Sequence, residues 1–312
     1  MKKTNKILYG FLRLAIIFVF LITLSHSLLR AQELEPRSLT NVPVGLNFLI
    51  GGYGYGNGNT LLDPTLPLED LTSDLHTFIF SYVRAIDFFG MSGKLDVMVP
   101  WAAGNWDGIY EGEQRDVKRD GFGDPRFRLS FNFLGAPSYS GPFDPSKTSK
   151  TVAGASLQII TPFGENFPDK LINLGSNRWT FRSQLGVAHT IGNWILEGYG
   201  GLWIFMPNNN FWGGRRLEQR PLFTLKLHLI YSLPPQGSWI AIGAGYGVGG
   251  RSVIDGIERD THISTLRLGL VYTIPLARGH MIKLGLTSGR RFEKGPDFDA
   301  IVLSYQYFWG GN

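Results

Sequence analysis

Apolar and polar side chains alternate along many segments of this chain, and this alternation is the feature that most restricts its fold. In residues 126–133, RFRLSFNF, every second side chain is apolar, and Arg, Ser and Asn lie between. A period of two places these sets on opposite faces of a β-strand, whereas a helix would scatter both. The pattern recurs in residues 94–99, 224–229, 265–270 and 282–287. We therefore expect an all-β protein.

The predicted strands are long. Most have about 9 to 13 residues, enough for a tilted strand to cross roughly 30 Å of hydrocarbon, whereas strands of soluble proteins usually have about five or six. A sheet in hydrocarbon must close into a barrel, because every backbone N–H and C=O needs a partner. The twelve predicted strands span residues 46–56, 75–86, 94–102, 125–134, 152–163, 178–191, 194–205, 221–232, 238–248, 262–274, 280–289 and 299–309.

The connections between these strands alternate in length. Short ones fall at 88–93, 192–193, 233–237 and 275–279, and longer ones at 57–74, 103–123, 164–177, 206–220, 249–261 and 290–297. Short turns on one rim and long loops on the other are typical of outer-membrane barrels. The connection 135–151 is long although it belongs to the short-turn rim, so it is either a periplasmic excursion or the sign of a missed strand.

Tryptophans are frequent at the ends of the predicted strands. Such positions suit an aromatic belt at a membrane surface, or else ordinary packing at hairpin ends in a soluble barrel. The six are Trp101, Trp179, Trp194, Trp203, Trp239 and Trp309. We expect residues 32–312 to form a single antiparallel transmembrane β-barrel of about twelve strands, with both termini on the periplasmic side.

The formal charge of +5 is confined to the N-terminus. Residues 1–31 hold five basic and no acidic side chains, so the rest of the chain carries 25 of each sign and no nucleic-acid partner is expected. The 11-residue apolar run 14–24 is too short for a spanning helix. It predicts a signal peptide over residues 1–31, cleaved after Ala31 or Ser27, with a retained anchor as the alternative.

Three segments resemble a known family. They are residues 35–45 (EPRSLTNVPVG), 123–126 (GDPR) and 169–179 (DKLINLGSNRW). The chain is similar here to outer-membrane proteins assigned to the meta-cleavage pathway of phenol degradation, many of which are called transporters, and the likeness extends over about residues 35–311. It implies an outer-membrane barrel of a Gram-negative bacterium and the passage of aromatic solutes. It supplies no catalytic residues.

If the apolar strand faces point to lipid, the opposite faces line the interior. Seven basic and two acidic side chains then leave an excess of five positive charges there. A low-dielectric wall focuses such a field on anions, and arginines also bind carboxylates or stack on aromatic rings. The expected lumen-lining residues are Lys94, Asp96, Arg126, Arg128, Arg182, Glu197, Lys226, His228, Arg267 and Lys283.

These residues support the hypothesis of a pore for small anionic or aromatic solutes. The alternative is that acids of the long loops fold inward, pair with the arginines and fill the barrel. Twelve strands lie between the filled eight-stranded and the water-filled sixteen-stranded barrels, so the lumen is expected to be narrow or partly plugged. The loop 103–123 is long enough to constrict it, or it stays solvated.

Other chemistries have weaker support. His262 and Ser264 have the spacing of the outer-membrane phospholipase pair, but that motif continues Asn-Gly, and Thr265 and Leu266 stand here. The remaining histidines and carboxylates lack metal-site spacing, and the chain has no cysteine, so neither metal nor cofactor is expected. Acids near Asp116 and in 255–260 could bind calcium or bridge lipopolysaccharide, or be simply solvated.

The sequence therefore predicts an outer-membrane channel for passive passage of small solutes, without enzymatic turnover. Its expected partners are membrane lipid and lipopolysaccharide, the barrel-assembly machinery and the solute. The alternatives are a structural or adhesive barrel and an outer-membrane hydrolase.

Overall fold

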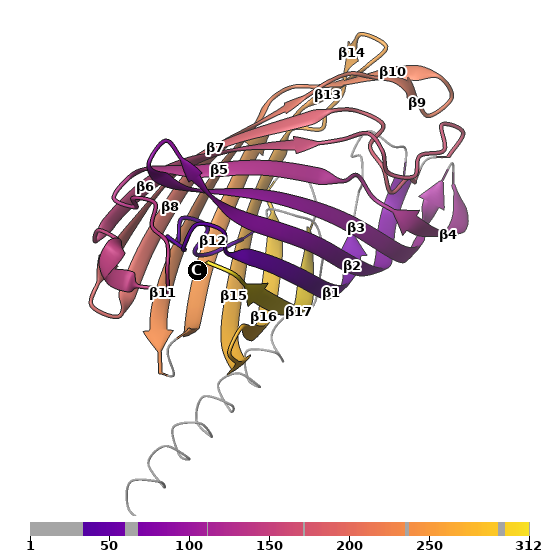
Figure 1. Ribbon diagram of the computed structural model, residues 1–312. Coiled ribbons are helices and arrows are strands. Elements are labelled where there is room, and N and C mark those ends of the chain that lie inside the picture. Colours follow the sequence, from indigo (N-terminus) through magenta and orange to yellow (C-terminus); the bar gives the residue numbers. More distant parts are fainter. Residues whose placement is uncertain are drawn as a thin grey trace, which may run out of the picture.

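Twelve antiparallel strands close into one barrel, as the sequence predicts (Figure 1). The computed structural model describes residues 34–59, 68–110, 112–170, 172–234, 237–292 and 297–311, and the expected signal peptide lies outside these ranges. The barrel strands are β1 (Asn47–Asn59), β2 (Leu68–Phe88), β3 (Met91–Tyr110), β5 (Arg126–Leu134), β6 (Thr151–Ile160), β7 (Thr180–Ile191), β8 (Trp194–Phe205), β11 (Leu222–Leu233), β12 (Ser238–Gly249), β15 (Ile263–Ala277), β16 (His280–Arg291) and β17 (Asp297–Trp309).

The two ends of the chain meet where the barrel closes. β1 pairs with β17 from Asn47 opposite Trp309 to Asn59 opposite Asp297. Gly310 then turns the chain with φ 86°, and a Cβ there would lie 2.7 Å from the carbonyl oxygen of Gly45, so only glycine fits. The residues after the last aromatic side chain therefore pack against the start of β1.

The outer face of the barrel is apolar and the inner face polar. On β11, Phe223, Leu225 and Leu227 are 58%, 54% and 55% exposed, whereas Lys226 and His228, at the alternate positions, are each 4% exposed. A water-soluble protein places such side chains the other way round. This arrangement is stable when hydrocarbon surrounds the barrel.

The tryptophan prediction is correct for some positions and wrong for two. Trp179, Trp194 and Trp309 are 40–47% exposed, as a belt requires. Trp203 and Trp239 point inward instead: the Arg182 guanidinium lies 4.9 Å from the Trp203 ring centre, and Trp239 is 6% exposed. Both lie at strand ends, but at positions whose alternation places them on the inner face.

The expected 103–123 loop is a hairpin that extends the barrel wall. β3 continues to Tyr110 and returns as β4 (Glu113–Phe122), which pairs with it throughout. Trp106, 1% exposed, lies opposite Val117 and packs with Leu75 and other apolar side chains. The hairpin continues the wall and most of β4 is exposed, so of the two alternatives the backbone of this loop does not fold inward as a constriction.

The other long connections at the same end also contain structure. β9 (Asn208–Phe211), β10 (Arg215–Gln219), β13 (Ser252–Ile254) and β14 (Ile257–Glu258) form a separate four-stranded sheet (Figure 1). At the opposite end, the connection 135–150 contains the short 3₁₀ helix η1 (Pro145–Lys147) and no barrel strand, so it is an excursion. No helix in the described ranges is long and apolar enough to cross a membrane.

Candidate functional site

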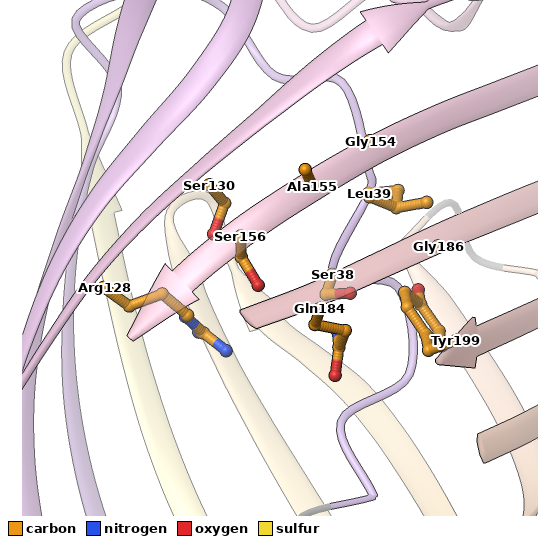
Figure 2. A pocket seen from close by; sticks show the side chains of 10 residues that line it. All are labelled: Ser38, Leu39, Arg128, Ser130, Gly154, Ala155, Ser156, Gln184, Gly186 and Tyr199. Atoms are coloured by element: carbon orange, nitrogen blue, oxygen red, sulfur yellow. The ribbon is translucent and has the colours of Figure 1, made fainter. Parts of the chain in front are cut away.

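The first described residues before β1 lie against the inner face of the barrel wall. Residues 34–46 are here called the N-terminal segment, and Figure 2 shows Ser38 and Leu39 of this segment among side chains of β5 to β8. The sequence predicts the barrel strands but assigns no position to this segment, because it has no alternating pattern.

A cluster of charges joins this segment to the wall at Arg128. The Arg128 Nε donates to Asp96 Oδ2 at 2.6 Å, and its two terminal nitrogens donate to Glu35 at 2.6 and 3.3 Å. Lys94 Nζ donates to the Ser38 carbonyl oxygen at 2.9 Å. Partial burial raises the pKa of Glu35, but Arg128 and two lumen lysines outweigh it, so the pKa lies below the ordinary value of 4.5.

A second polar contact lies around Glu197. Its Oε2 accepts a hydrogen bond from the Arg37 backbone N–H at 2.9 Å, and His228 Nδ1 lies 3.6 Å from the same oxygen. The side chains of Glu197 and His228 are almost completely buried. Burial lowers the pKa of the Arg37 guanidinium, and the Glu197 carboxylate opposes this effect. The segment is thus held from both strands β5 and β8.

Two leucines of the segment fit against glycines of the wall. Leu39 packs in a buried cluster with Ala136, Val152, Ala188 and Tyr199. A Cβ at Gly154 would lie 2.7 Å from the Leu39 Cδ2, and one at Gly269 would lie 2.7 Å from the Leu34 Cδ1. The missing side chains leave the space that the leucines fill.

Little free space remains between segment and wall. The cavity beside Leu39 has a volume of about 10 Å³, roughly the space of one water molecule. Figure 2 shows the ten residues that line it: Ser38, Leu39, Arg128, Ser130, Gly154, Ala155, Ser156, Gln184, Gly186 and Tyr199. The N-terminal segment therefore packs closely against the wall at Leu39.

The ten residues expected in the lumen all lie at inward positions of their strands. Lys94, Asp96, Arg128, Glu197 and His228 belong to the two contacts described above. The others are spread around the barrel and do not form one site. Four of them place the cation near the centre of an aromatic ring: Arg182 at 4.9 Å from Trp203, Lys226 at 5.5 Å from Tyr199, Arg267 at 3.9 Å from Phe298 and Lys283 at 6.0 Å from Trp239. The fifth, Arg126, is the first residue of β5.

One of the two acids that pair with Arg128 comes from an unexpected place. Asp96 is on the wall, and the alternative hypothesis expected loop acids folded inward, but the second acid is Glu35 of the N-terminal segment. Strand periodicity contains no signal for such a contact, because Glu35 lies outside every strand. The N-terminal segment does not change the net charge of the interior, because the negative charge of Glu35 and the positive charge of Arg37 cancel.

The environment of Ser264 bears on the pair His262 and Ser264, whose spacing is that of outer-membrane phospholipases. Ser264 lies on the outer face, and its hydroxyl forms a 2.8 Å hydrogen bond with the Tyr246 hydroxyl on the adjacent strand β12. Within the described residues, no group of three or more His, Asp and Glu side chains is arranged to hold a metal ion.

Comparisons with known proteins agree with this fold. The family model described as "Putative MetA-pathway of phenol degradation" matches residues 45–294. The structure is similar to an outer-membrane channel from Pseudomonas putida F1, with 19% identity, 89% of this chain and 100% of that chain covered and a TM-score of 0.74. It also resembles the β-domain of the Bordetella autotransporter BrkA, with 11% identity, coverage of 84% and 99% and a TM-score of 0.50.

No curated protein matches the sequence significantly. At these identities the structural likenesses concern the fold, which is that of an outer-membrane β-barrel.

Proposed function

The chain belongs to the phenol-degradation family whose model it matches and lies in the bacterial outer membrane, and from this premise we propose that it is a passive channel for small anionic or aromatic solutes. The solved structure most relevant to this proposal is named as an outer-membrane channel. The family description refers to the degradation of an aromatic compound.

The reversed polarity of the barrel is the observation that carries this proposal. The ten residues expected in the lumen lie at inward positions and carry an excess of five positive charges, while the outer face is apolar. Charged side chains are stabilised by water more than by an apolar interior. A charged inner face is therefore suited to a water-filled passage, which a purely structural barrel does not require.

We infer that the described structure is a closed state of such a channel. Residues 34–40 contact inward side chains of the wall, while residues further along the segment are fixed at the rim: Val44 N donates to the Tyr139 carbonyl oxygen at 2.8 Å, and Gly45 N to that of Ala85 at 2.9 Å. We infer that residues 34–40 move aside for passage and that the rim contacts stay in place.

Single-channel recording in planar bilayers tests this function. In a potassium chloride gradient, we expect a reversal potential that indicates preference for chloride, because the lumen is positive. Swelling of proteoliposomes in benzoate, and slower growth of a deletion strain on dilute aromatic acids than of the complemented strain, would support the solute class. A cation preference would contradict anion selectivity, and no conductance or swelling would contradict the channel.

Two other functions are distinguished by the same preparations. We propose that the protein has no catalytic turnover, and ester hydrolysis that is lost in Ser264→Ala would overturn this. A barrel that is folded but inactive in all transport assays would be structural or adhesive.

We also propose two partners besides membrane lipid. Lipopolysaccharide would contact the exposed aromatic and charged side chains at the rim with long connections. The barrel-assembly machinery would recognise β17, in which Tyr305, Tyr307 and Trp309 are exposed on the outer face. Crosslinking from these three positions in intact cells tests the contact with the machinery, and crosslinking from exposed side chains of the long connections tests the contact with lipopolysaccharide.

A further inference from the structure

We propose that the position of Glu35 on Arg128 is a carboxylate-binding site, and that Glu35 occupies it in the closed barrel in place of the carboxylate of a small aromatic acid. This inference rests on the proposed channel function and specifies its solute class. The site consists of Arg128, Asp96 and Lys94 on the wall and is filled from the N-terminal segment.

Arg128 binds one fixed and one exchangeable carboxylate. Asp96 lies directly opposite Arg128 where β3 pairs with β5, and its Oδ2 accepts from the Arg128 Nε at 2.6 Å. The two terminal nitrogens donate to the two oxygens of Glu35. Because Asp96 orients the guanidinium from the wall, the two-pronged donor stays in place when Glu35 leaves.

The exposure of the two acids supports this distinction. The Asp96 side chain is 7% exposed, while that of Glu35 is 35% exposed. Glu35 belongs to a segment outside the barrel sheet, so it can move without breaking a strand pair. Asp96 cannot move without disturbing β3.

The surroundings of the site favour an anion over a neutral group. Lys94 donates to the Ser38 carbonyl oxygen in the same segment, and the positive charges of Lys226 and Lys283 reach Glu35. Removal of Glu35 alone would leave these cations without its charge, which is costly in a partly buried site. An incoming carboxylate restores the balance.

Aromatic rings close to cations of the interior indicate that the rest of the ligand, beyond its carboxylate, is also an aromatic ring. The Lys226 ammonium lies 5.5 Å from the Tyr199 ring centre, and the Arg37 guanidinium and Lys283 ammonium lie 5.9 and 6.0 Å from that of Trp239. Flat rings beside cations offer stacking surfaces to a benzene ring. The predicted ligand class is therefore a small aromatic monocarboxylate.

Calorimetric binding of benzoate to the purified full-length mature protein tests the proposal, with benzamide as the uncharged analogue. In Glu35→Gln, which keeps the shape and removes the competing charge, we expect benzoate to bind about tenfold more tightly, as loss of a competing charge-assisted hydrogen bond implies. Benzamide binding should not change. Glu113→Gln is the matched control, because Glu113 also pairs with an arginine, Arg115, but on the exposed β4 hairpin.

A second variant tests the shape of the donor. Adding Arg128→Lys to Glu35→Gln keeps the positive charge and removes the two-pronged geometry, so the tenfold gain should be lost. Heat-dependent migration in gel electrophoresis verifies that each variant is folded. If Glu35→Gln fails to fold, protease cleavage of the N-terminal segment in the unmodified protein should accelerate with benzoate and not with benzamide.

Two results would overturn the proposal. Unchanged benzoate binding in Glu35→Gln would show that Arg128 is no carboxylate site for solutes. An equal increase in affinity for benzoate and benzamide in Glu35→Gln would show that Glu35 only holds the segment in place and does not compete with a carboxylate. Failure of the channel function itself is separate, because it would appear as absent conductance while binding remains measurable.

Discussion

Leu39 holds the N-terminal segment against the wall where Gly154 leaves room for it. Its side chain is 7% exposed and packs with Val152, Ala188 and Tyr199. Because the contact joins the segment to three different strands, its loss should affect the closed state more than the barrel itself.

The variant Leu39→Ala tests this role. Truncation of a buried leucine costs about 2–5 kcal/mol, so the balance between closed and open states should shift at least about 30-fold toward the open state. We expect higher conductance and faster protease cleavage of the segment. Leu276→Ala, at an exposed leucine near the β15–β16 turn, is the control. Unchanged conductance and cleavage would contradict a role in closure.

At the level of single residues, the sequence predicts which side chains face inward but not which of them meet. Alternation places Arg128 and Asp96 on the inner face of their strands. It contains no information on Glu35, which lies in an irregular segment and reaches Arg128 across 93 positions of sequence. Such a contact depends on the closed barrel and cannot be derived from local pattern.

Each barrel strand depends on the lipid around its outer face. A charged side chain on this face near the bilayer centre costs about 2–4 kcal/mol and little near the interface. Leu227 lies in the middle of β11 and Leu276 at the end of β15, and their exposures are similar at 55% and 56%.

A comparison of the variants Leu227→Arg and Leu276→Arg therefore measures how the cost of a charged side chain depends on its depth in the membrane. We expect Leu227→Arg to reduce the folded fraction after refolding into lipid vesicles, as measured by heat-dependent migration, and Leu276→Arg to leave it nearly unchanged. Equal effects of the two variants would mean that the outer face does not contact hydrocarbon at these positions.

The number and order of barrel strands were predictable because alternation is strong in most of them, although the segments 46–56, 152–163 and 194–205 alternate poorly. The prediction failed where a strand extends beyond the membrane, as in β3 and β4. There the pattern is set by the pairing of Trp106 with Val117 and by packing on Ile172, which lies far along the chain. Loop composition alone does not reveal such packing.

The barrel as a whole does not need the N-terminal segment for closure. Every barrel strand has two neighbours without it, since β1 pairs with β2 and β17. Deletion of residues 34–40 should therefore leave a folded barrel and raise its conductance several-fold. Replacement of the same residues by a Gly/Ser sequence of equal length separates loss of contacts from loss of length. A deletion variant that is folded and conducts no better would place the barrier elsewhere.

Because the N-terminal segment continues directly into β1, Glu35 is covalently tethered close to the site that it occupies. A tethered group competes at an effective concentration on the order of millimolar, whatever the amount of protein. Reclosure is then a first-order event that dilution cannot slow. An external acid must either be abundant or bind much better than Glu35 does, so half-maximal occupancy of the site would require a higher solute concentration than in a barrel without Glu35.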